Sequence, residues 1–187
     1  MDKAQPATKV ITGLVRFSYA HVFKPHSSIE GSEPKYSVCL LVPKKDRYSV
    51  AALQAGIKAA VTAGTSSHWG GKTPKNLKTP LRDGDEERPD DENYAGMYFI
   101  NASSKMKPMI VDRDKNEILD PMDFYSGCWG RASINFFPYD AVGNRGIGAG
   151  LNNLQKLKDG EPLSSRTDAK TDFADDFDLG DDDDPMG

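Results

Sequence analysis

Aromatic and basic side chains alternate along much of this 187-residue chain. Arg16 precedes Phe17, Lys35 precedes Tyr36, and Trp69 is followed within six residues by two lysines. Cationic side chains can follow a phosphate backbone, while flat rings accept unpaired bases at about 1 to 3 kcal/mol each, whatever the base. This pairing of residue types therefore indicates a surface that could bind single-stranded nucleic acid.

Four rings are candidates for stacking on bases, because each lies beside glycines or at the edge of a polar loop, where a nucleotide could approach the backbone. Any of them could instead fill the core, since a domain of this size buries most of its large side chains. The stacking candidates are Trp69, Tyr94, Tyr125 and Trp129, and the candidate phosphate contacts are Arg16, Lys35, Lys72, Lys75, Lys105, Lys107 and Arg131.

The charge of the chain is divided unevenly between its body and its carboxyl end. Residues 168–187 carry nine acidic side chains and one lysine, a charge of −8, whereas the other 167 residues carry 23 basic and 19 acidic side chains, a charge of +4. A basic body is suited to polyanions. Low hydrophobicity and high charge predict disorder from residue 161 onward. We therefore expect a folded domain over 1–160 and an acidic tail over 161–187 that competes with a polyanionic ligand for the basic body.

Catalytic, metal and cofactor sites have little support in the sequence. The glycines of 146–150 lack dinucleotide-binding spacing, and the three histidines and two cysteines lack zinc-site spacing. Asp112 and Asp114 could hold a magnesium ion in a nuclease, but their charged string between two apolar runs favours a hairpin turn. Cys39 and Cys128 lie in apolar runs that predict buried thiols. We therefore expect no enzyme activity, no cofactor, no metal and no membrane segment.

The elements that must position these residues are mostly strands. β-Branched and aromatic residues predict strands over 8–23, 35–42, 96–102, 108–112 and 127–138, the first two of them paired. Asp46 as an N-cap, followed by apolar residues at helical spacing up to Gly64, predicts a helix over 46–63. Residues 65–93 are typical of a long polar loop, and 146–158 closes the folded part at residue 160. Five or six strands with one helix predict a small closed barrel.

Several segments resemble a family of single-stranded-DNA-binding proteins of tailed phages. The resemblance spans about residues 8–160, carried by 16–23, 35–44, 126–139 and 146–160, and is most specific in Leu-Asn-Asn-Leu-Gln at 151–155 with Asp-Gly-Glu-Pro at 159–162. It implies a mainly β, OB-type β-barrel with one main α-helix and a disordered acidic C-terminal tail. It also implies binding of single-stranded DNA without sequence specificity, in phage replication or recombination in the host cytoplasm.

The tail also resembles the acidic carboxyl ends of bacterial and phage single-strand-binding proteins. That resemblance implies competition with DNA and recruitment of replication or recombination proteins. Self-association along DNA is a separate expectation. Those tails usually end in an aromatic residue, whereas this chain ends in Asp-Pro-Met-Gly, which leaves Phe173 and Phe177 as internal anchors. The alternatives are a strand-annealing recombination mediator, a metal-dependent nuclease using Asp112 and Asp114, and a phage structural or chaperone-like protein whose tail engages a basic partner.

Overall fold

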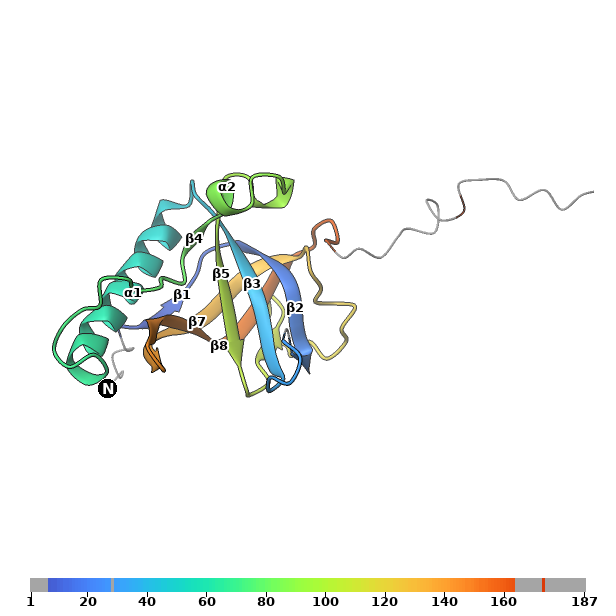
Figure 1. The fold of residues 1–187 in the computed structure, drawn as a ribbon. Helices are drawn as coiled ribbons and strands as arrows, with labels where there is room; N and C mark the ends of the chain where they lie inside the picture. Colours follow the sequence, from blue (N-terminus) through green and yellow to red (C-terminus); the bar gives the residue numbers. More distant parts are fainter. Residues whose placement is uncertain (1–6, 28, 164–172, 174–187) are drawn as a thin grey trace, which may run out of the picture.

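A closed barrel of strands forms the body of the protein. The computed structural model describes residues 7–27, 29–163 and 173. Its sheet has the order β1-β7-β2-β3-β5-β8-β6, and an additional β7–β8 pairing closes five strands into a ring (Figure 1). The elements are β1 (Lys9–Ile11), β2 (Val15–His26), β3 (Lys35–Pro43), α1 (Arg47–Ser67), β4 (Arg82–Asp83), α2 (Gly84–Glu87), η1 (Glu92–Tyr94), β5 (Met97–Ser104), β6 (Met109–Val111), β7 (Trp129–Ala141) and β8 (Asn144–Lys158).

Alternate residues of the strands fill the core. On β3, Val38, Leu40 and Val42 are at most 1% exposed, and on β7 Ile134 and Phe136 are equally covered. Successive side chains of a strand point to opposite faces, so the period of two in the sequence becomes an inner and an outer face of the barrel. The predicted closed, mainly β barrel is confirmed, as is the pairing of the first two strands, which the structure shows to be antiparallel between β2 and β3.

The first predicted strand is divided in two. Residues 9–11 form β1 and residues 15–26 form β2, with Thr12 fully buried between them. The Thr12 hydroxyl accepts a hydrogen bond from the amide of Ala132 at 3.0 Å, and Gly13 donates its amide to the hydroxyl of Ser49 at 2.8 Å. These hydroxyls satisfy backbone amides at the bend between β1, which pairs with β7, and β2, which pairs with β3. The hydrophobic pattern of the sequence does not indicate this bend.

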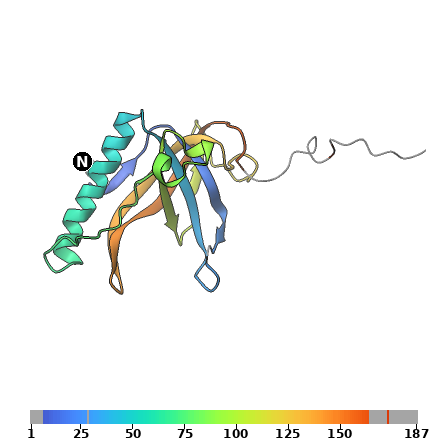
Figure 2. The same cartoon turned by 45° about the horizontal axis from the view of Figure 1, so that its top comes forward.

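The predicted helix is confirmed at its start and extends further than expected at its end. Asp46 caps α1 by accepting the Ser49 amide at 3.0 Å, and α1 then packs on β1, β7 and β8 at one side of the barrel (Figures 1 and 2). Gly64 does not stop the helix, which continues to Ser67. A Cβ at Gly64 would lie 2.6 Å from Pro138 and 2.7 Å from the Trp69 ring, so this glycine allows a close approach between elements.

The predicted loop over 65–93 contains short elements as well as irregular chain. Its acidic half folds into α2 and η1, because Asp83 accepts the amide of Asp85 and Asp91 accepts the amide of Asn93. Carboxylates at these positions satisfy backbone donors at the start of a helical turn. Lys44 at the end of β3 holds the segment, with its ammonium 2.6 Å from Asp83 and 2.7 Å from Asp85.

The folded body ends later than residue 160. The amide of Leu163 donates to the carbonyl oxygen of Ser126 at 2.9 Å, and its side chain packs on a small cluster outside the barrel that contains Cys39 and Tyr94. Three residues of the predicted tail therefore belong to the body, while 164–172 and 174–187 lie outside the described residues. Among the described residues, no helix is long and apolar enough to cross a membrane.

Candidate nucleic-acid interface

Trp129 lies at one end of the barrel with a cationic side chain from each neighbouring strand. It is the first residue of β7 and pairs in register with Arg16 on β2 and Lys158 on β8. The Arg16 guanidinium lies 5.7 Å and the Lys158 ammonium 5.1 Å from the centre of the ring. Strand register alone therefore places two positive charges beside a half-buried indole, which is a favourable cation–π arrangement.

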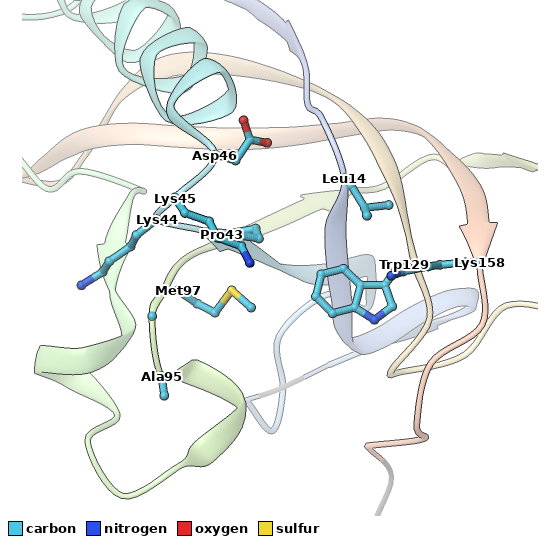
Figure 3. Close-up of a pocket in the computed structure, with 10 residues that line it drawn as sticks. Leu14, Pro43, Lys44, Lys45, Asp46, Ala95, Met97, Trp129 and Lys158 are labelled. Atoms are coloured by element: carbon cyan, nitrogen blue, oxygen red, sulfur yellow. The ribbon is translucent and has the colours of Figure 1, made fainter.

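A groove of about 670 Å³ opens beside this tryptophan. In Figure 3, Trp129 and Met97 project into it from opposite sides, whereas Lys44 points away toward the acidic segment that binds it. The groove thus combines an apolar floor with positive charge at its edge. Its lining residues are Leu14, Pro43, Lys44, Lys45, Asp46, Ala95, Gly96, Met97, Trp129 and Lys158.

Arg16 holds the backbone around the groove together. Its guanidinium donates to the carbonyl oxygen of Glu161 at 2.7 Å, to that of Gly127 at 3.1 Å and to the side chain of Asn93 at 3.4 Å. Three of its five donors are therefore engaged within the chain. This predicted phosphate contact therefore binds the chain's own backbone and Asn93 in the structure, and part of its guanidinium is left for a ligand.

Tyr125 and Trp129 both lie beside Gly160, whose carbonyl oxygen accepts a hydrogen bond from the Tyr125 hydroxyl at 3.2 Å. The same hydroxyl donates to Asp159 at 2.8 Å, and the ammonium of Lys156 lies 5.3 Å from the Tyr125 ring centre and 2.7 Å from the same carboxylate. Burial and the bond to Asp159 raise the pKa of Tyr125, while Lys156 and Tyr125 lower the pKa of Asp159. The ring is half-buried and supports the segment that borders the groove.

Trp69 is a core residue, in contrast to the expectation of an exposed stacking ring. It is 5% exposed, lies against Gly64 of α1, and donates its indole N–H to the carbonyl oxygen of Tyr139 at 3.3 Å. The four residues by which α1 continues past its predicted end place the ring against β7. The loop glycines that follow Trp69 therefore do not expose it.

Tyr94 is also buried, at 5% exposure, which corrects the second of the four ring predictions. It packs edge-on against Phe99 with ring centres 5.1 Å apart, and its hydroxyl contacts the sulfur of Cys39. Burial raises the pKa of Tyr94, and it raises the pKa of Cys39 to about 11. Cys39 and Cys128 are both buried free thiols, as the sequence predicts.

The predicted phosphate contacts are spread over several surfaces. Lys35 and Lys105 border a separate cavity of about 490 Å³, and Lys107 lies 5.8 Å from the centre of the Phe23 ring. Arg131 donates to the carbonyl oxygen of Thr12 at 2.9 Å and borders a smaller cavity on the outside of β7. Lys72 and Lys75 are exposed in the segment after α1. The structure thus brings Arg16 and Trp129 together, and Lys35 and Lys105 together, but not all of the candidates.

Sequence reasoning selected only Trp129 among the residues that line the groove, and the residues it missed include Leu14, Lys45, Met97 and Lys158. Each lies at or within two residues of a strand end, and closure of the barrel brings those ends to one rim. The sequence marks these residues only by their position next to predicted strand ends. That position indicates a shared groove only once the barrel topology shows which strand ends lie together. Asp112, by contrast, accepts the amides of Asp114 and Asn116 at 2.9 Å each, as the favoured hairpin turn requires.

Among the described residues, no group of three or more His, Cys, Asp or Glu side chains is arranged to hold a metal ion.

Comparison with known proteins gives one family and one fold. A family model described as the ssDNA-binding protein of Enterobacter phage Enc34 matches residues 8–186. Protein p50 of Acyrthosiphon pisum secondary endosymbiont phage 1 is 29% identical over 182 residues, which is 91% of this chain and 95% of the relative.

Solved structures show the same architecture. The single-stranded DNA-binding protein from bacteriophage Enc34 in complex with ssDNA is 27% identical, with a TM-score of 0.72 over 87% of this chain and 97% of that chain. The single-stranded DNA-binding protein gp2.5 of bacteriophage T7 is 14% identical and has a TM-score of 0.59 over 86% of this chain and 97% of that chain, which shows a shared fold. The predicted OB-type barrel with one long helix is therefore confirmed, and the chain belongs to the family of the phage Enc34 single-stranded-DNA-binding protein.

Proposed function

We propose that this protein binds single-stranded DNA without catalysis and without sequence specificity, and that the groove beside Trp129 is part of its binding surface. In this role it coats transient single strands during phage replication or recombination in the host cytoplasm. The observation that carries the proposal is the indole of Trp129, bordered by Arg16 and Lys158 and facing a groove with apolar walls, in a member of this family.

The chemistry of the groove suits an unpaired nucleotide. A base can stack on an indole or pack against Leu14 and Met97 irrespective of its hydrogen-bonding edge, which explains an absence of sequence preference. Lys45 and Lys158 at the edge of the groove can neutralise phosphates. Affinity is therefore expected to fall with salt at a slope of about −0.7 for each phosphate contacted, giving roughly −3 to −4 for about four to six contacts.

The proposal extends to the acidic tail, which we expect to compete with DNA for the basic body and, once displaced, to recruit replication or recombination proteins. The supports are the charge of −8 over residues 168–187 against +4 over the remainder, and the position of Leu163. Because Leu163 is fixed beside β2, the acidic tail is tethered to the surface of the body, and we expect it to compete there at high effective concentration.

Intrinsic fluorescence tests the binding proposal directly, because the chain has only two tryptophans. Trp69→Phe leaves Trp129 as the single reporter, and Trp129→Phe leaves the buried Trp69 as the matched control. Titration with poly(dT) at several salt concentrations should quench Trp129 strongly and Trp69 weakly, with weaker binding at higher salt. Binding that does not depend on salt, or quenching confined to Trp69, would contradict the proposed groove.

A further inference from the structure

Tyr19 presents an exposed ring on the outer face of β2. Its side chain is 65% exposed, and its backbone φ is +45°, a left-handed conformation that residues other than glycine rarely adopt. The pairing of β2 with β3 is irregular between Ser18 and His21, and Ala20 donates its amide to the hydroxyl of Ser126 at 3.0 Å. The surrounding structure thus maintains a strained residue that directs a tyrosine away from the core, and such strain is concentrated at functional sites.

Three cavities follow β2 in order along its length. Leu14, which directly precedes β2, borders the Trp129 groove, while Tyr19 and His21 border a second cavity of about 420 Å³. His26 at the end of β2 borders the third cavity, of about 490 Å³. Figure 1 shows β2 running beside β3 on the side of the barrel away from α1. A single extended ligand following β2 would therefore meet all three cavities.

The third cavity is suited to phosphate. Lys35 and Lys105 border it together with the hydroxyls of Ser37 and Ser103, and its one bordering carboxylate, Glu33, lies 3.2 Å from the Lys105 ammonium. The second cavity contains Asp91, whose carboxylate accepts the amide of Asn93 in the cap of η1. Positive charge therefore lies at the two ends of the path, and an exposed ring lies between them.

We propose that Tyr19 is a second stacking ring and that DNA held at Trp129 continues along β2 to the Lys35–Lys105 cavity. The inference rests on the proposed function, since it extends the same binding surface. The occupant is a single-stranded polyanion with flat bases, which complements the lysines at the far end and the ring in the middle. Leu163 also borders the second cavity, so the rival occupant is the chain's own segment beyond it.

Oligonucleotide length separates the two parts of the path. In a Trp69→Phe background, oligo(dT) of about four and about sixteen nucleotides, the limits of the range for one such fold, is titrated against Tyr19→Ala, Tyr19→Phe and Tyr48→Ala. Tyr48 is a comparably exposed tyrosine on α1, at 75%, and borders none of the three cavities, so it is the matched control.

We expect Tyr19→Ala to weaken binding of the longer oligonucleotide about tenfold or more, with unchanged quenching of Trp129 by the shorter one. Tyr19→Phe and Tyr48→Ala should bind both as the parent does. Equal affinity of Tyr19→Ala and the parent for the longer oligonucleotide would overturn the inference, and tighter binding would identify the chain's own segment as the occupant. If the parent itself binds neither oligonucleotide, it is the proposed function that fails.

Charge variants test the far end of the path. Lys35→Ala combined with Lys105→Ala should make the salt slope for the longer oligonucleotide shallower by about 1.4, twice the value for one phosphate, while Lys58→Ala on α1 leaves it unchanged. Glu33→Gln should tighten binding at low salt, because it frees Lys105 from its ion pair. An unchanged slope in the double variant would show that DNA does not reach this cavity.

Discussion

The two tryptophans differ in environment although their sequence neighbours are alike. Both lie beside glycine and within three residues of a basic side chain, yet Trp69 is 5% exposed against α1 and β7 while Trp129 borders the groove. The indole N–H of Trp69 is bonded to Tyr139, as a buried tryptophan requires. The same residue type is therefore buried in the core at one position and borders an open groove at the other.

Replacing each tryptophan by alanine should separate binding from stability. Trp129→Ala is expected to weaken binding of single-stranded DNA about ten- to a hundredfold, because a stacking ring is lost. Trp69→Ala should lower the free energy of unfolding by about 3–5 kcal/mol, because it leaves a cavity in the core. Denaturant unfolding and oligo(dT) titration of both variants provide the measurement. A larger stability loss in Trp129→Ala than in Trp69→Ala would reverse the assignment.

At the scale of elements, α1 illustrates how a residue of low helix propensity can be required by packing. Gly56 and Gly64 are both buried, and a Cβ at Gly56 would lie 2.7 Å from Val10 and 2.9 Å from Phe136. Alanine would favour the isolated helix at either position by about 1 kcal/mol. The close contact with neighbouring elements opposes that gain, and overpacking of this kind costs about 1–3 kcal/mol.

Gly64→Ala should therefore lower the melting temperature despite its better helix propensity. Pro138 and the Trp69 ring are both held in place by packing, so the added methyl group has no flexible neighbour to displace. Gln54→Ala, at an exposed position of the same helix, serves as the control and should leave the melting temperature nearly unchanged. A melting temperature that rises in Gly64→Ala would show that α1 can move outward at no cost.

Lys44 forms ion pairs with Asp83 and Asp85, and the contribution of these ion pairs to stability should depend on pH. The ammonium of Lys44 lowers the pKa values of Asp83 and Asp85, which are held below their ordinary range. A carboxyl whose pKa is lowered by folding stabilises the fold above its unfolded pKa of about 3.9 and loses that effect as pH falls through the lower, folded pKa.

Lys44→Ala should accordingly destabilise the protein at neutral pH, and the difference from the parent should shrink as the pH falls below about 3.9. Thermal unfolding of both proteins over this range, at low salt, measures the difference. Because these groups are partly exposed, the effect should be small and should decrease with added salt. A difference that grows on acidification would mean that Lys44 acts by another route.

At the scale of the whole molecule, the acidic tail and the basic body oppose each other. Truncation after Ser165 removes residues 166–187, which carry nine acidic side chains against Arg166 and Lys170, a charge of −7, and retains Leu163. We expect it to tighten binding of single-stranded DNA, most at low salt, because both tail and DNA attraction are screened at high salt. Dissociation constants of the full chain and the truncated chain for one oligonucleotide, at two salt concentrations, decide the matter. Equal affinities at low salt would show that the tail does not compete.

A longer truncation, after Gly160, provides the structural control. It removes the carbonyl oxygen of Glu161, which binds Arg16 at 2.7 Å, and the side chain of Leu163, which covers the cluster around Tyr94. This variant should melt at a lower temperature than the one truncated after Ser165, because it loses packing as well as charge. Identical melting temperatures would place the end of the folded body at residue 160, as the charge pattern had predicted.

The sequence determined the features that depend on neighbours along the chain. Alternation specified most strands, Asp46 with the apolar spacing specified α1, and the charge pattern separated the basic body from its acidic end. The sequence could not show whether the Tyr94 ring is buried or exposed, because the residues that bury it, Cys39 and Phe99, come from β3 and β5.

Only the tertiary structure decided which rings are available and where cations meet them. Strand register places Arg16 and Lys158 beside Trp129. Arg16 is more than a hundred residues from Trp129 in the sequence, and Lys158 is twenty-nine residues from it. Closure of the barrel brings strand ends to a common rim, and the segment of α2 and η1 covers part of the outer face. Local sequence encodes the direction in which a side chain points, but whether another segment lies there depends on contacts distant in the chain.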